Sequence, residues 1–207
     1  MSQIIKLPGV NIRIDGVNEI IEKLSRFEGN QQKKLIKAAV NDTIAETKRL
    51  LVKYTSKAYV KKQSEISATL SARKATVSKP EATVFSKGKI LEPLDYRASP
   101  SSMAAQQNRK IAAKAKILRG SSMKALVLDG RKAFLVPLPY ETKAGEKGEH
   151  LAIVQRKGKE RYPILKLLST SVPGAIRSDR VQEIVSPMIK QKLAANLSKH
   201  IEEVLNK

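Results

Sequence analysis

The C-terminal part of the chain repeats an apolar residue at every fourth position, seven times in succession. A step of four places these side chains along one side of an α-helix, so the pattern predicts a long helix over about residues 178–206 with one buried face. Ser178 is a candidate N-cap, and Pro187 is expected either to kink the helix or to start a second one. The buried face requires a partner surface. It consists of Val181, Val185, Ile189, Leu193, Leu197, Ile201 and Leu205.

The N-terminal half supplies a second long helix that could be this partner. Residues 31–54 contain no Gly or Pro and carry a wide apolar face, which predicts a helix packed on another element. Shorter helices are expected over 16–28, after Asp15 as a cap, and within 61–70, so that the helical part covers about 16–70. Before it, residues 3–14 alternate around Pro8-Gly9 as two short extended pieces with a turn.

The composition changes to that of strands over about residues 71–165. A hairpin is expected over 71–85 and a strand over 91–97. The Ser/Ala/Gln-rich run 98–110 is expected to be a flexible loop that becomes ordered on docking to a neighbouring subunit. Asp129-Gly130 is the sharpest turn signal in the chain. Four short apolar pieces are expected to form one antiparallel sheet: 115–118, 125–128, 133–138 and 151–155.

These elements together predict an α+β fold. We expect an antiparallel sheet packed by a long helix in the N-terminal half and by a long C-terminal helix, all within one domain over 1–207. The chain has 207 residues and no cysteine, which excludes disulfide scaffolds, thiolate metal sites and cysteine nucleophiles. We find no repeat of 20–50 residues, signal peptide or apolar stretch of membrane-spanning length.

The formal charge of +21 is concentrated in the middle of the chain. Residues 61–139 carry 16 basic and 5 acidic side chains. This excess suits either a solvated surface or a surface that faces the phosphates of a nucleic acid, and we give the two readings equal weight. Aromatic residues make up only 4% of the chain and Trp is absent, so stacking on bases is not expected. The candidate nucleic-acid-facing residues are Lys114, Lys116, Arg119, Lys124, Arg131 and Lys132.

The chain offers little for catalysis. It lacks the G-x-S-x-G, G-x-x-x-x-G-K-[ST] and G-x-G-x-x-G patterns. His150 could bind a metal only together with carboxylates such as Glu146 or Glu149, and an ordinary exposed histidine is the favoured reading. We therefore predict no catalytic, cofactor-binding or metal-binding residues, no cofactor and no enzymatic activity.

A series of short motifs runs in order through the second half of the chain. They are Ala133-Phe134, His150, Arg156-Lys157-Gly158, Pro163-Ile164 and Ser171-Val172-Pro173. In this order the segment 115–173 resembles the prophage minor tail protein Z family, which is related to the tail completion proteins of long-tailed bacteriophages. Two positions depart from the family pattern: Ser169-Thr170 stand in place of Gly-Pro, and Glu149 stands in place of a Gly before His150.

The resemblance implies a structural role. It implies a minor component of a bacteriophage or prophage tail that completes the head-proximal end of the tail and aids head-tail joining. Expected partners are further copies of the chain in a ring, other tail or connector proteins and, without sequence specificity, phage DNA in the lumen; no membrane is expected. The expected location is the virion, and the host cytoplasm during assembly. The alternative is a non-specific nucleic-acid-binding protein outside any particle.

Overall fold

The computed structural model describes residues 5–7, 10–12, 24–25, 27–106, 111–141 and 145–206. Two long helices and several antiparallel ladders confirm the α+β class. The chain forms two compact units, whereas the sequence suggested a single domain. Unit 1 comprises Met1–Ser56, Lys62–Gly88 and Pro173–Lys207, and unit 2 comprises Lys57–Lys61 and Lys89–Val172.

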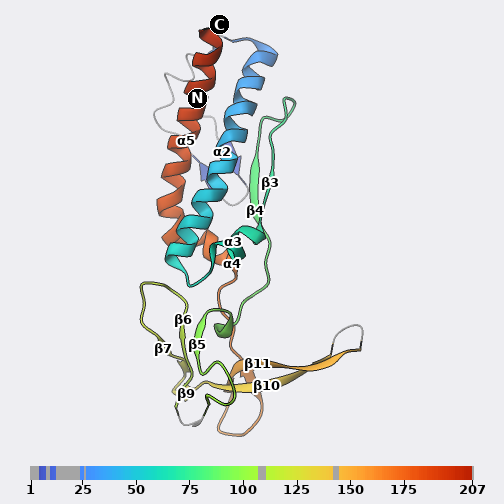
Figure 1. Ribbon diagram of the computed structural model, residues 1–207, viewed down its shortest axis with the longest axis vertical. Helices are drawn as coiled ribbons and strands as arrows, with labels where there is room; N and C mark the ends of the chain where they lie inside the picture. Colours follow the sequence, from blue (N-terminus) through green and yellow to red (C-terminus); the bar gives the residue numbers. More distant parts are fainter. Residues whose placement is uncertain are drawn as a thin grey trace. The chain divides into compact units, whose positions relative to one another are not determined.

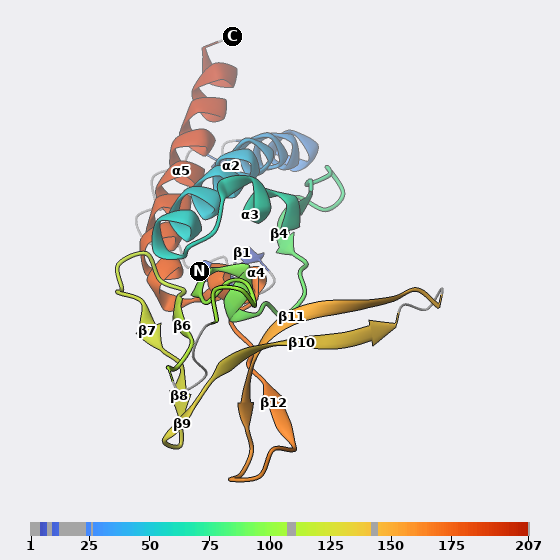
Figure 2. The same cartoon turned by 60° about the horizontal axis from the view of Figure 1, so that its bottom comes forward.

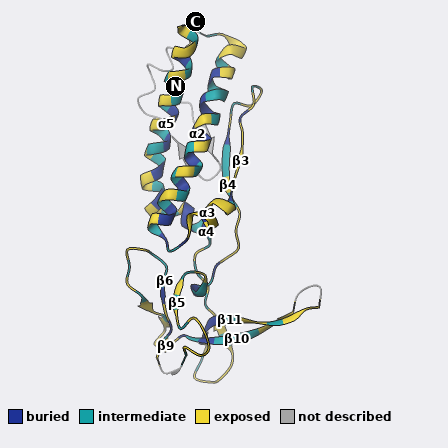
Figure 3. Ribbon diagram, in the orientation of Figure 1, coloured by how far each residue is buried: buried dark blue, intermediate teal, exposed yellow. Residues whose placement is uncertain are grey.

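Unit 1 is built on the two predicted long helices. Helix α2 (Gly29–Ala58) and helix α5 (Asp179–Leu205) lie side by side and run antiparallel (Figure 1). Their facing stripes are buried and their outer sides are exposed (Figure 3). Six of the seven stripe residues of α5 are buried, from Val181 to Ile201, and Leu205 is 50% exposed at the end of the helix. The partner required by the C-terminal stripe is therefore α2.

The start of α5 follows the prediction in position but not in detail. Ser178 occupies the N-cap, yet its hydroxyl donates to the carbonyl oxygen of Ala175 at 2.7 Å and makes no cap hydrogen bond. The short helix α4 (Val172–Arg177) ends just before it, which supplies that acceptor. Pro187 does not start a second helix, because α5 continues through it from Asp179 to Leu205.

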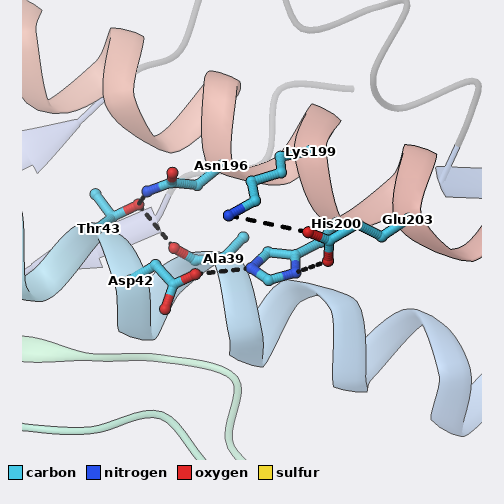
Figure 4. A network of polar contacts seen from close by, with 7 residues as sticks. All are labelled: Ala39, Asp42, Thr43, Asn196, Lys199, His200 and Glu203. Atoms are coloured by element: carbon cyan, nitrogen blue, oxygen red, sulfur yellow. Dashed lines mark hydrogen bonds and ion pairs between the residues drawn. The ribbon is translucent and has the colours of Figure 1, made fainter.

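Polar contacts fix the pairing of α2 with α5 (Figure 4). The Nε2 atom of His200 lies 2.8 Å from Asp42 Oδ2, and Nδ1 of the same ring lies 3.2 Å from Glu203 Oε2. One helical turn away, Asn196 Nδ2 donates to Thr43 Oγ1 at 3.0 Å. That hydroxyl in turn donates to the carbonyl oxygen of Ala39 in its own helix at 2.7 Å, so the buried hydroxyl of Thr43 is satisfied.

A β-hairpin completes the core of unit 1. Strands β3 (Leu70–Arg73) and β4 (Thr83–Ser86) pair antiparallel and follow the short helix α3 (Gln63–Thr69), as the sequence predicted. Ala75, Ala82 and Val84 pack into the same apolar cluster as the residues of α2 and α5. The side chain of Asn41 holds the hairpin to α2 by accepting from the backbone nitrogen of Ala75 at 2.8 Å and donating to its carbonyl oxygen at 3.2 Å.

The two extended pieces predicted at the N-terminus are present. They are β1 (Ile5–Leu7) and β2 (Val10–Ile12), paired antiparallel. Of the helix predicted over 16–28, Leu24 and Ser25 are helical and Phe27 lies in a bend; most of the remaining range lies outside the described residues.

Unit 2 contains the other strands, distributed over three sheets. This corrects the expectation that the four apolar pieces form one sheet. The β8–β9 ladder is a separate hairpin, closed by Asp129 and Gly130 with φ angles of 51° and 72°, as a two-residue type I′ turn requires. The three sheets consist of β5 (Arg97–Ser99), β6 (Lys114–Lys116) and β7 (Lys124–Ala125); β8 (Val127–Leu128) and β9 (Arg131–Lys132); and β10 (Phe134–Glu141), β11 (Lys147–Arg156) and β12 (Ile164–Lys166).

Two further expectations for this part of the chain are corrected. The strand predicted over 91–97 is an isolated bridge from Leu91 to Ser169 followed by the 3-10 helix η1 (Pro93–Asp95), because Pro93 opens a helical turn. The run 98–110 is not simply a flexible loop. It begins in β5, and the side-chain amide of Gln106 is bonded to both backbone groups of Leu135. Residues 107–110 lie outside the described residues.

Candidate nucleic-acid interface

A row of basic side chains lies on one face of the β5–β6 ladder. Arg97 stands directly opposite Lys116, and Lys114 lies two residues along the same strand as Lys116. Successive residues of a strand alternate between faces, so these three side chains share one face. Ala98 and Ala115, between them, face the other way, and both are at least partly buried. Arg97 was not among the predicted residues, because only the strand register shows that it joins them.

The other members of the predicted basic set lie elsewhere in unit 2. Lys124 is opposite Ala115 in the β6–β7 pair. Its side chain therefore lies on the same face as Ala115, and Lys114 lies on the opposite face. Arg119 has a structural contact: its Nη2 donates to the carbonyl oxygen of Lys61 at 3.4 Å, and its backbone nitrogen donates to Ala58 at 2.9 Å. The six predicted residues therefore do not form one patch.

Arg131 and Lys132 line an open pocket together with basic residues that were not among the predicted nucleic-acid-facing residues. The pocket has a volume of about 300 Å³ and is lined by Arg131, Lys132, Phe134, Arg156, Gly158 and Lys159. Arg156 and Lys159 come from the end of β11 and the turn after it, more than 20 residues from Arg131. No spacing in the sequence indicated this meeting, because it depends on the pairing of β10 with β11.

A buried glutamine holds the two sides of the pocket together. Gln155 is only 3% exposed, and its Nε2 donates to the carbonyl oxygens of Leu128, at 2.6 Å, and of Arg131. These two residues flank the Asp129-Gly130 turn, so Gln155 fixes the β8–β9 hairpin against β11. The backbone of Arg131 is therefore held next to β11.

Phe134 orients one of the cations. The guanidinium carbon of Arg156 lies 5.9 Å from the centre of the Phe134 ring, within the range of a cation–π interaction. Phe134 itself is only half-buried and lines the pocket.

The residues that line the pocket are of the kind that bind anions. It combines four cations with an aromatic ring and a glycine, and its described lining contains no carboxylate. Guanidinium and ammonium groups at such a surface suit phosphate oxygens, which they contact without reading bases. The described residues contain no group of three His, Asp or Glu side chains placed to hold a metal ion.

The side chain of His150 contacts the carboxylate of Glu92. It lies within β11, and its Nε2 is 3.0 Å from Glu92 Oε1, while Lys166 Nζ is 2.6 Å from the same carboxylate oxygen. Glu92 precedes η1, so these pairs join η1 to β11 and β12. The carboxylate that meets His150 is thus that of Glu92, which the sequence did not indicate.

Unit 2 also exposes many large apolar side chains. They include Ile90, Ile111, Leu128, Tyr140, Tyr162 and Leu168, each at least 50% exposed.

No described helix is long and apolar enough to cross a membrane. Searches with this chain against protein-family models, curated proteins and solved structures found no match.

Proposed function

We propose that the protein is a structural minor component of a bacteriophage or prophage tail, which completes the head-proximal end of the tail and helps to join tail and head. The observation that carries this proposal is the ordered motif series in the segment 115–173. Its expected location is the virion, and the host cytoplasm during assembly. Its partners in this proposal are further copies of the chain in a ring and other tail or connector proteins.

The positions of the motifs support the proposal. Ala133-Phe134 leads into β10, His150 lies in β11, Arg156-Lys157-Gly158 ends β11, and Pro163-Ile164 starts β12. Motif residues that are up to 30 positions apart in the sequence therefore belong to one three-stranded sheet. Ser171-Val172-Pro173 then begins α4.

The surface of unit 2 is also suited to an assembled protein. Its exposed apolar side chains are of the kind that subunit contacts cover. Unit 2 holds 19 of the 40 basic residues and 7 of the 19 acidic ones. In a ring around DNA, such a surface would hold phosphates without sequence specificity.

The proposal is tested by quantitative mass spectrometry of gradient-purified particles, with the copies of this chain counted against the major tail protein. We expect a small fixed number, equal to one ring. Absence of the chain from intact particles would contradict a place in the mature tail. Reversing two predicted cations, Lys114→Glu with Lys124→Glu, is expected to weaken DNA retention and leave particle shape unchanged.

The second candidate is a non-specific nucleic-acid-binding protein outside any particle. The observation that favours it is the basic pocket around Phe134, which needs no assembly to form. Salt-dependent binding to duplex DNA is expected for both candidates, so particle association separates them. Free protein bound to DNA in the cell, with none in particles, would favour this second function.

A further inference from the structure

The two edges of the β10–β11 ribbon differ in their backbone hydrogen bonding. Strand β10 is an edge strand, because β11 is its only neighbour in the described sheet. The side-chain amide of Gln106 accepts from the backbone nitrogen of Leu135 and donates to its carbonyl oxygen. The backbone groups of Leu135 therefore point away from β11, to the outer edge.

The outer edge of β10 is closed beyond this point too. Backbone groups alternate in direction along a strand, so Pro137 and Pro139 also face outward. Proline has no N–H group and offers no donor to a further strand. Gln106 and the two prolines thus prevent β10 from accepting another strand.

The opposite edge, along β11, is open over its first half. Leu167 donates its backbone N–H to the carbonyl oxygen of Ile153 at 2.9 Å, which shows that Ile153 points away from β10. By the same alternation, Leu151, Glu149 and Lys147 point that way. Strand β12 covers β11 only from Val154 to Arg156. In the described chain no strand pairs with the β11 edge over 147–151, and Figure 2 shows the β10–β11 ribbon running on as a two-stranded arm beyond β12.

We propose that this edge of β11 pairs with the same edge of a second copy of the chain, with the two strands antiparallel and related by a twofold axis at Gly148. The proposal rests on the backbone ladder of unit 2 and is independent of the role in a phage tail. An isologous contact of this kind joins four strands across the two copies.

Charge complementarity selects both the occupant and the register. With the axis at Gly148, Lys147 of each copy lies opposite Glu149 of the other, which gives two cross-strand ion pairs on one face. Glu141 already stands opposite Lys147 within each ribbon, so the ammonium group of Lys147 would lie between two carboxylates, one from its own copy and one from the other. If the axis were at Glu149, the two Glu149 carboxylates would face each other, which is unfavourable.

A charge-swap series tests the proposal on the full chain. Lys147→Glu or Glu149→Lys alone places like charges opposite each other twice per dimer, whereas the double variant restores both pairs in reversed order. Sedimentation equilibrium at about 150 mM salt limits the general repulsion between two strongly basic copies. We expect each single variant to lower the association constant about tenfold or more, and the double variant to return within about threefold of the wild type.

Matched controls separate this effect from a change in net charge. Arg180→Glu and Glu183→Lys make the same charge changes at exposed positions of α5 in unit 1, and they are expected to associate as the wild type does. A double variant that remains as weak as the single variants would overturn the proposal.

Cysteine pairing provides a second readout that detects even a weak contact. The chain has no cysteine, so Lys147→Cys and Glu149→Cys each introduce a single thiol. Oxidation of an equimolar mixture is expected to give the mixed disulfide in several-fold excess over either homodisulfide. Predominance of the Glu149→Cys homodisulfide would overturn the register, and the statistical mixture, with no preference, would overturn the second copy as the occupant.

Discussion

At the scale of single residues, the buried side chain of Gln155 is expected to stabilise unit 2, because it bonds β11 to the β8–β9 hairpin. Replacing it with Leu removes two hydrogen bonds and leaves the carbonyl groups of Leu128 and Arg131 without this donor. We expect a loss of about 1–3 kcal/mol in the free energy of unfolding, measured by urea denaturation with tyrosine fluorescence. The exposed Gln191→Leu is the control and is expected to change it by less than about 0.5 kcal/mol. Equal effects of the two substitutions would contradict the role of Gln155.

Tyr96 is the residue for which a titration is expected to be abnormal. Its hydroxyl donates to the carbonyl oxygen of Thr170 at 2.5 Å. Burial raises its pKa from 10.0 to about 12, with smaller contributions from Tyr59 and Asp95. The folded state thus favours the neutral phenol, so this contribution to stability is complete below pH 10 and is lost as the pH rises from 10 to 12.

The measurement is the pH dependence of unfolding for the wild type against Tyr96→Phe, with the phenolate followed by ultraviolet absorbance. The part of the stability loss between pH 10 and 12 that is due to Tyr96 is expected to vanish in the variant. Identical pH profiles for the two proteins would show that Tyr96 titrates normally.

At the scale of elements, the packing of α5 on α2 is tested within one stripe. Ile201 is fully buried and Leu205, one turn later, is half exposed. Ile201→Ala leaves a cavity in the core of unit 1 and is expected to cost about 2–5 kcal/mol of unfolding free energy. Leu205→Ala is expected to cost less than about 1 kcal/mol, because its side chain loses little burial. Thermal or urea unfolding of both variants measures the difference, and similar costs would contradict the packing.

At the scale of the whole molecule, both the net positive charge and the cations of the pocket are expected to contribute to the affinity for DNA. We expect the affinity for duplex DNA to fall steeply with salt. The test variant reverses two pocket cations, Arg131→Glu with Arg156→Glu. The control variant, Lys33→Glu with Lys34→Glu, makes the same total change of charge at two exposed positions of α2. We expect the test variant to lower the affinity for DNA and the slope of its salt dependence more than the control does. Fluorescence anisotropy between about 50 and 200 mM salt measures this. Equal losses in the two double variants would assign the binding to net charge alone.

Several elements of the fold have signals that are local in the sequence. The apolar stripe of α5, the apolar face of α2, the hairpin over 71–85 and the Asp129-Gly130 turn could all be predicted, because helix periodicity, strand composition and positive φ depend on nearby residues. The pairing of the strands could not be predicted in the same way, because strand register depends on contacts between residues that are distant in the sequence. For that reason Arg97 joins Lys114 and Lys116, Arg156 and Lys159 meet Arg131 beside Phe134, and Gln106 closes one edge of a ribbon whose other edge stays open.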